Sequence, residues 1–285
     1  MNINRYPGHM EKTKKDIKNS LNLVDIVAEI IDSRIPISSS NPLLKEITGS
    51  KPRIILMNKA DLADQLENKK WIKFFKEKGI NAVEVNSKKN IDTDLIYKMS
   101  KEQLKEEFQI RERKGIENKK IKMMVVGIPN SGKSTFINNI SNRKGTNTGN
   151  RPGITKQKQW IRTKSNLDLL DTPGVLWPKF ESEEIGLHLS YTHAIKDEII
   201  DIETLCLKFI SEIQKIDTNI FKDRYKIETK NMTDIEIFEE IAKKRGCLIK
   251  NGIYDYTKCA NLIFQDFRTG KLGRITLEKY DLFKI

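Results

Sequence analysis

Residues 127–134 have the types and spacing that phosphate binding requires. The stretch GIPNSGKS holds glycines at both ends of a loop, followed by Lys133 and the hydroxyl of Ser134. Glycines let backbone N–H groups wrap closely around phosphates, a lysine here reaches the β- and γ-phosphates, and the serine hydroxyl ligates magnesium. The nucleotide-binding residues of this loop are expected to be Asn130, Ser131, Gly132, Lys133, Ser134 and Thr135.

The tetrapeptide NKAD, from Asn58 to Asp61, indicates which base the nucleotide carries. A carboxylate at Asp61 can accept hydrogen bonds from guanine N1–H and from the guanine amine, a pair of donors that adenine lacks. Lys59 is expected to lie along the base, and Asn58 to tie the motif to the phosphate loop. Asn86 and Ser87 begin a second motif, in which the Ser87 backbone N–H would donate to guanine O6.

A third group of residues fits the magnesium side of such a site. The stretch DTPG supplies a carboxylate at Asp171 and, at Gly174, an N–H that can meet the γ-phosphate. Between it and the phosphate loop, Thr155 is expected to be the switch threonine that ligates magnesium. Thr146 and Thr148 are alternatives for that role.

The elements that must position these motifs are short apolar strands that alternate with helical stretches. Each motif lies just past the carboxyl end of such a run, where ligands bind in parallel sheets. We predict an α/β fold, a P-loop GTPase domain with a mainly parallel sheet and helices on both faces. The expected strands are 24–31, 54–57, 82–85, 123–126 and 167–170, with helices at 10–21, 71–79 and 94–114.

After residue 178 the strand-like runs fade and helical periodicity appears, at 202–213 and 234–244. We therefore predict two domains, a GTPase domain with an N-terminal extension at 1–182 and a smaller all-α domain at 183–285. The DTPG motif comes last in the first domain. Only a short segment, from Val175 to about Ser182, separates this γ-phosphate sensor from the helices, which suggests a direct covalent route between them.

The composition favours an anionic partner. The 285 residues carry 52 Lys and Arg against 39 Asp and Glu, a formal charge of +13. From Asn118 to Leu167 there are Lys and Arg residues but no acidic residue, which favours nucleic acid over a merely solvated basic face. The three cysteines form no paired motif and are read as reduced thiols. The N-terminus does not resemble a signal peptide, and no apolar run is long enough to span a membrane.

The order of the motifs indicates a family, because NKAD precedes the phosphate loop, the reverse of an ordinary GTPase. The chain resembles the circularly permuted GTPases, and most closely the bacterial ribosome biogenesis GTPase A family. The resemblance runs nearly end to end and includes the stretches YPGHM at 6–10, DSRIP at 32–36, RGC at 245–247 and DFRTGKLGR at 266–274.

The resemblance implies a cytoplasmic GTP-hydrolysing factor for late maturation of the large ribosomal subunit. Its partners would be the subunit precursor and its ribosomal RNA, which the helical domain would contact. Neither a membrane nor DNA is an expected partner, and the protein is expected to be monomeric. GTP or GDP and Mg²⁺ are the expected ligands, with K⁺ as a further candidate.

Hydrolysis in this chain is expected to be slow without outside help. Val175 stands where other GTPases carry the glutamine that orients water, and its apolar side chain cannot do so. Besides Lys133 and Thr155, two residues are candidates for a catalytic contribution. Asn130 matches an asparagine that in related GTPases helps to hold K⁺ near the phosphates, and His9 could position water, or instead pack or bind RNA.

Two other functions stay open at this point. The protein could be an RNA-binding scaffold in which GTP is only a structural ligand, although Lys133, Ser134, Thr155 and Asp171 argue against this. It could also be a permuted GTPase that acts on another ribosomal target. Those relatives carry an appended oligonucleotide-binding barrel or a cysteine zinc site, and the sequence shows neither.

Overall fold

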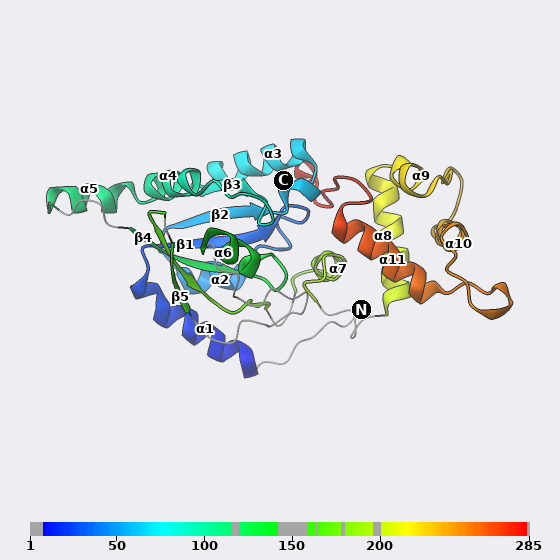
Figure 1. Cartoon of the computed structure of the whole chain (residues 1–285), viewed down its shortest axis with the longest axis horizontal. Coiled ribbons are helices and arrows are strands. Elements are labelled where there is room, and N and C mark those ends of the chain that lie inside the picture. Colours follow the sequence, from blue (N-terminus) through cyan, green and yellow to red (C-terminus); the bar gives the residue numbers. More distant parts are fainter. Residues whose placement is uncertain are drawn as a thin grey trace.

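The computed structural model describes residues 8–115, 120–141, 159–163, 165–177, 180–195 and 201–283. These residues form a six-stranded sheet in the order β3-β2-β1-β4-β6-β5, with a group of helices beside it (Figure 1). Neighbouring strands are parallel except for β5, which is antiparallel to β6. The strands are β1 (Ile26–Asp32), β2 (Arg53–Asn58), β3 (Asn81–Val85), β4 (Ile121–Gly127), β5 (Gln159–Arg162) and β6 (Leu167–Asp171).

Helices cover both faces of this sheet. The helices in this part of the chain are α1 (Gly8–Ser20), α2 (Pro42–Thr48), α3 (Gln65–Glu77), α4 (Thr93–Gln103), α5 (Lys105–Arg113) and α6 (Lys133–Ser141). Side chains of β1 alternate between the faces, as the two-residue period of a strand requires. Ala28 and Ile30 lie in the core with α4 and α6, whereas Val27 and Ile31 lie in cores with α1, α2 and α3.

The second half of the chain is helical within the described ranges. Its helices are α7 (Glu183–Tyr191), α8 (Ile202–Ile216), α9 (Asn219–Tyr225), α10 (Asp234–Lys244) and α11 (Tyr256–Thr269). Their starts are set by side-chain caps, such as Asp201 for α8 and the capping box of Thr233 and Glu236 for α10. Aromatic rings of Phe209 and Phe264 lie 5.4 Å apart in their shared core.

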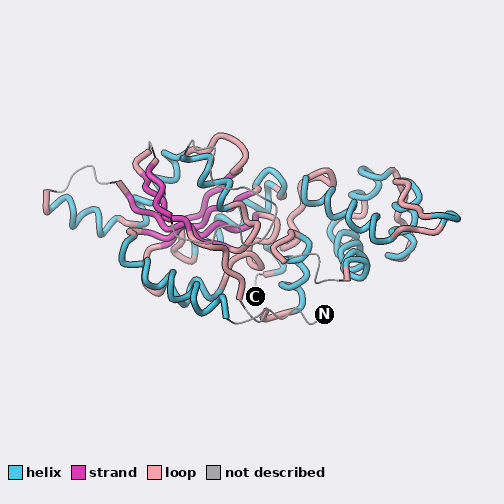
Figure 2. The backbone as a smooth tube through the Cα atoms, turned by 60° about the horizontal axis from the view of Figure 1, so that its bottom comes forward, coloured by secondary structure: helices cyan, strands magenta, loops and turns pink. Residues whose placement is uncertain are grey.

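The end of the chain turns back onto the sheet domain after α11. Trp71 of α3 donates its indole N–H to the Glu278 carbonyl (3.0 Å), and the Tyr280 ring lies edge-on to Trp71 at 5.5 Å. Figure 1 shows this last segment, at the red end of the colour bar, beside α3. Figure 2 shows the strands gathered in one twisted layer, with the bundle of later helices to one side. The segment that follows α11 therefore contacts the sheet domain through α3.

The predicted fold class is confirmed. The sheet is mainly parallel with helices on both faces, and the predicted strands lie at β1, β2, β3, β4 and β6. The helical stretch 94–114 is two helices, α4 and α5, rather than one. The sequence does not predict the edge strand β5, because only Ile161 of its four residues is buried and the stretch QWIR has no apolar run. The predicted domain boundary at 182/183 stays a prediction.

None of the helices in the described ranges has the length and apolar character that crossing a bilayer requires. Cys206, Cys247 and Cys259 are buried free thiols of the helical core, and burial raises the pKa of Cys206 well above its usual value. Asp266, which begins the DFRTGKLGR stretch, is buried and accepts from Arg224 Nε at 2.8 Å. Thr269 ends α11, and Gly270 caps it with a left-handed backbone.

Candidate functional site

The phosphate loop joins β4 to α6, and two of its glycines are required by close contacts. A Cβ on Gly127 would lie 2.4 Å from the Ile30 carbonyl oxygen, and one on Gly132 would lie 2.1 Å from Asn58 Nδ2. Both glycines have positive φ, at 152° and 98°, which L residues rarely adopt. The loop therefore passes so close to β1 and to the end of β2 that only glycine fits.

Lys133 is the first residue of α6 and is buried within this loop. Its ammonium donates to the carbonyls of Gly127 (3.1 Å) and Ile128 (2.9 Å). Burial lowers the pKa of Lys133 to about 8, and the charge of Asp171 opposes that fall. Lys133 thus lies where a phosphate group bound in the loop would meet its charge. Ser134 and Thr135 follow in the first turn of the same helix and are half-buried.

Asn58 joins three motifs that lie far apart in the sequence. Its Nδ2 donates to the Ser131 carbonyl in the phosphate loop (2.7 Å). Its Oδ1 accepts from the backbone N–H of Ser87 (3.0 Å) and from the Ser87 hydroxyl (2.8 Å). The predicted link between NKAD and the phosphate loop is therefore made by this side chain, and the same amide also holds the motif that follows β3. Asn139 of α6 adds a bond to the Ser87 carbonyl at 3.2 Å.

The other residues of the base motifs lie around this junction. Lys59 has a left-handed backbone (φ 58°) and donates to the Asn130 carbonyl at 2.8 Å. Asp61 is exposed in the short 3-10 helix η2 (Ala60–Leu62), which leaves its carboxylate accessible. Asn86 is half-buried, and its Oδ1 accepts from the Lys88 N–H at 3.0 Å.

The DTPG motif lies on the other side of the phosphate loop, at the end of β6. Asp171 is buried there, and the Thr172 hydroxyl donates to the Val125 carbonyl of β4 at 2.8 Å. Gly174 is next to the lysine of the loop, because a Cβ on it would lie 2.9 Å from Lys133 Nζ. Val175 is buried in the sheet core and donates its N–H to the Gly127 carbonyl at 3.2 Å, so its side chain points away from the phosphate loop.

Some predicted residues lie outside this description. Thr155, Thr146 and Thr148 are not among the described residues, and for His9 only its place in the first turn of α1 is described. Asn130, the candidate K⁺ ligand, has a left-handed backbone (φ 57°), and its Nδ2 donates to the His193 carbonyl at 2.6 Å. The phosphate loop is therefore bonded to the turn that follows α7. Within the described ranges no cluster of His, Cys, Asp and Glu has a metal-binding arrangement.

The sequence reasoning missed two residues of the site, Asp32 and Arg34. The Asp32 carboxylate accepts from Lys59 Nζ (2.9 Å) and from Arg34 Nε (2.9 Å), and both Asp32 and Arg34 are buried. The strand register pairs Asp32 with Asn58, so both strands end at the same place. The sequence does carry a signal for Asp32. It is an acidic residue at the end of a predicted strand, and the next predicted strand of the same parallel sheet ends in NKAD.

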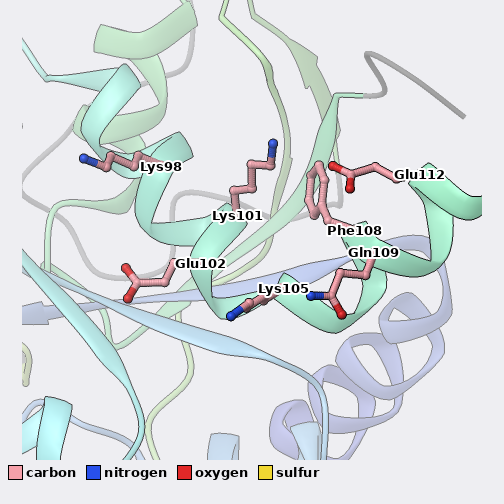
Figure 3. Close-up of a pocket in the computed structure, with 7 residues that line it drawn as sticks. All are labelled: Lys98, Lys101, Glu102, Lys105, Phe108, Gln109 and Glu112. Carbon is pink, nitrogen blue, oxygen red and sulfur yellow. The ribbon is translucent and has the colours of Figure 1, made fainter.

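An open pocket lies between α4 and α5, at the far end of the sheet domain from the later helices (Figures 1 and 3). Its lining mixes charges and includes none of the motif residues. The lining residues are Lys98, Lys101, Glu102, Lys105, Phe108, Gln109 and Glu112. Within this lining, Lys101 Nζ lies 5.2 Å from the centroid of the Phe108 ring. The nucleotide motifs, rather than this pocket, form the candidate functional site.

Fold and site together define a P-loop GTPase whose motifs follow one another in circularly permuted order. The sequence profile of the family described as "50S ribosome-binding GTPase" matches residues 122–239. Ribosome biogenesis GTPase A of Bacillus cereus is 41% identical over 283 residues, which cover 99% of this chain and 96% of the relative. The protein of the same name from Thermotoga maritima is 32% identical, with coverages of 96% and 93%. The chain belongs to the ribosome biogenesis GTPase A family.

Solved structures support the same assignment. The GDP-bound structure of TM YlqF has a TM-score of 0.66 and 28% identity, and the match covers 93% of this chain and 99% of that one. GNP-bound YlqF from T. maritima has a TM-score of 0.63 and 29% identity, with coverages of 94% and 98%. The likeness therefore extends over the sheet domain and the later helices.

Proposed function

We propose that this protein is a GTP-hydrolysing factor for late maturation of the large ribosomal subunit. Its nucleotide state controls binding to the subunit precursor and release from it. The observation that carries the proposal is the bonding of Asn58, which joins NKAD, the phosphate loop and the Ser87 motif into one site. The relatives named as ribosome biogenesis GTPase A, and the family described as 50S ribosome-binding, support the choice of target.

In this proposal the nucleotide is held at its two ends by different residues. Asp61 accepts from guanine, the Ser87 N–H donates to guanine O6, and Lys59 lies along the base. The loop amides and Lys133 bind the phosphates, and the Gly174 N–H meets the γ-phosphate. The close approach of Gly174 to Lys133 Nζ supports this last role.

The residues near the phosphate loop also fit a hard cation. Ser134 offers a hydroxyl in the first turn of α6, and the buried carboxylate of Asp171 lies near Lys133. We propose that Ser134 and Thr155 ligate Mg²⁺ directly and Asp171 through water, since oxygen donors suit this ion. When bound, Mg²⁺ would neutralise charge on the β- and γ-phosphates. Asn130 is the proposed contact for K⁺.

We further propose that intrinsic hydrolysis is slow and that ribosomal subunits stimulate it. The buried position of Val175 supports this, because no water-orienting side chain follows Gly174. His9 and a K⁺ ion held by Asn130 are the proposed compensations. Replacing His9 with Ala should lower ribosome-stimulated turnover, and replacing K⁺ with Na⁺ should lower the rate. Unchanged rates would remove the respective role.

The proposed partners are the precursor of the large subunit and its RNA, in the cytoplasm, with the protein acting as a monomer. The formal charge of +13 supports an anionic partner. Binding to the precursor should therefore weaken steeply as salt rises, because phosphate contacts release counterions. Binding that barely responds to salt would contradict an RNA interface.

The deciding experiment is GTP turnover with and without purified large subunits. Wild type should be stimulated by large subunits more than by small ones. Lys133→Ala should lose nucleotide binding, whereas Lys122→Ala, an exposed lysine of β4, should behave as wild type. Tight subunit binding without stimulation would instead favour the scaffold, and stimulation by small subunits would favour a different ribosomal target.

A further inference from the structure

Asp32 is a buried carboxylate at the end of β1, next to Asn58, and none of the expected nucleotide contacts includes it. It is 2% exposed and accepts from the Arg34 backbone N–H (3.1 Å), from the Arg34 guanidinium (2.9 and 2.7 Å) and from Lys59 Nζ (2.9 Å). Burial alone would raise the pKa of this carboxyl, but Arg34 and Lys59 reverse the effect and hold the pKa well below its usual range. Asp32 is therefore charged under all physiological conditions.

Lys59 is held between this carboxylate and the phosphate loop. Its ammonium donates to Asp32 Oδ2 at 2.9 Å and to the Asn130 carbonyl at 2.8 Å. Its left-handed backbone is uncommon for a lysine, and side-chain bonds at both sides can maintain it. Without Asp32, one of the two anchors that set the direction of this side chain would be lost.

Arg34 connects the same carboxylate to helix α11. It is 1% exposed, and its guanidinium lies 4.7 Å from the centroid of the Phe267 ring and donates to the Phe267 carbonyl at 3.4 Å. A buried guanidinium that is bidentate on one side and stacked on the other fixes the relative position of its partners. Asp32, Arg34 and Phe267 thus form a continuous contact between the base motif and the helices.

The segment after α11 contacts the residues that follow β1 and β2 at two further points. The Ile275 N–H donates to the Leu62 carbonyl at 3.0 Å, and the Leu277 N–H donates to the Arg34 carbonyl at 2.9 Å. Gly270 packs against Leu62, because a Cβ there would lie 2.7 Å from Leu62 Cδ2. Residues 58–62 therefore contact the phosphate loop through Asn58 and Lys59, and the end of α11 through Leu62.

We propose that Asp32 is a positioning residue for Lys59, and that Arg34 couples the guanine-binding loop to helix α11. The inference rests on the proposed guanine site at residues 58–61. Guanine binding restricts the motion of Lys59 and of its partner Asp32. Because Arg34 bonds to Asp32 and contacts Phe267, the motion of Phe267 is restricted as well. Because Lys59 lies on the base side, GDP and GTP have the same effect on α11. By reciprocity, loosening Phe267 weakens both nucleotides equally.

The first test compares Asp32→Asn with Glu29→Gln. Glu29 is a matched control, because it is a fully buried carboxylate of the same strand that pairs with Arg53 (3.1 Å) rather than with a nucleotide motif. Asp32→Asn should weaken GDP and the non-hydrolysable GTP analogue GMP-PNP by a similar factor, about tenfold or more, as expected for losing a charged hydrogen bond. Glu29→Gln should keep wild-type affinity for both nucleotides.

The second test follows amide hydrogen exchange in α11 of the full chain, with and without GDP. In wild type, GDP should slow exchange in α11 by about fivefold or more. Phe267→Leu should lose this response, whereas Phe264→Leu should retain it. Phe264 is the matched control because both rings are buried in α11 and contact Phe209, but only Phe267 lies under Arg34.

Each outcome has a defined reading. If wild type binds GDP and Asp32→Asn binds it with the same affinity, the positioning role of Asp32 is overturned. If Asp32→Asn loses affinity for only one of the two nucleotides, the proposal that Asp32 acts through the guanine base is overturned. If Asp32→Asn does not fold, the hydrogen-exchange experiment tests the proposal instead. If GDP slows exchange in α11 equally in Phe267→Leu and Phe264→Leu, the coupling through Arg34 is overturned. A wild type that binds no guanine nucleotide overturns the proposed function itself.

Discussion

Two of the connections from the nucleotide site to the later helices are built from different interactions. On the base side, the ion pair of Asp32 and Arg34 contacts Phe267 of α11. On the phosphate side, the chain itself crosses from one core to the other. Val175 lies in the sheet core, and Leu176, the next residue, lies in the core of the helices.

The difference lies in how each connection depends on geometry. An ion pair with bidentate bonds and a stacked ring fixes a single arrangement, and breaking it leaves a buried charge without its partner. Apolar packing at Leu176 is less directional and tolerates small shifts. The base side is thus suited to hold the helices in one place. The phosphate side is suited to move them, which agrees with the covalent route that the sequence suggests between the DTPG motif and the helices.

The largest expected effect comes from breaking the base-side connection. Arg34→Met should lower the free energy of unfolding by about 3–5 kcal/mol, because the buried Asp32 would lose the bidentate bonds to its cationic partner. Chemical denaturation followed by fluorescence measures this change. Arg34→Lys should lose less, since it retains the charge. A loss below about 1 kcal/mol for Arg34→Met, typical of exposed pairs, would contradict the importance of this connection.

A somewhat smaller effect is expected where the base motif meets the phosphate loop. Gly132→Ala places a Cβ 2.1 Å from Asn58 Nδ2 and must displace an amide that bonds to Ser131 and Ser87. Unfolding free energy should fall by about 2–4 kcal/mol, and GDP titration should show greatly weakened binding. Gly79→Ala is the control for positive φ alone, because a Cβ there meets no atom within 4 Å. Equal losses in both variants would show that only backbone strain matters.

The phosphate-side connection should respond differently. Leu176→Ala should cost about 2–3 kcal/mol of stability through the cavity it leaves. Affinity for GDP should stay near wild type, whereas the ratio of GMP-PNP to GDP affinity should change, because this residue follows the proposed γ-phosphate contact of Gly174. Parallel titrations with the two nucleotides measure it. An unchanged ratio would argue against a phosphate-side route.

The smallest expected effect concerns a junction that belongs to neither connection. Buried His188 of α7 contacts Glu212 of α8 (2.7 Å) and Glu278 of the final segment (3.2 Å), and the Ser38 hydroxyl lies 3.2 Å from its Nδ1. Burial alone would lower the pKa of His188, but the two carboxylates reverse this and raise it to about 10. The imidazolium is therefore the form that the fold stabilises.

The sign of the pH effect follows from that shift. The folded pKa lies above the unfolded value of 6.5, so the contribution is complete below pH 6.5 and is lost as pH rises toward about 10. Wild type should lose on the order of 2 kcal/mol between pH 7 and 8.5 that His188→Gln does not lose. Denaturation midpoints across this range measure it. Parallel pH profiles of the two proteins would contradict the assignment.

Much of the fold and of the site is determined locally by the sequence. Short apolar runs form strands, and polar motif residues at their ends come to lie at one edge because parallel strands all end there. Asn58, Ser87, Gly127 and Asp171 are found at these places, at or just after the ends of β2, β3, β4 and β6. The order of these motifs alone was enough to indicate the family.

Other features were decided only by the tertiary structure. The bond from Arg34 to Phe267 spans 233 residues, and no local pattern indicates which aromatic residue an arginine will meet. Strand β5 has one buried residue, so its pairing with β6, and not its composition, makes it a strand. The return of Glu278 to Trp71 likewise depends on packing. Hydrophobic periodicity encodes which face is buried, whereas the identity of a distant partner depends on how complete elements pack.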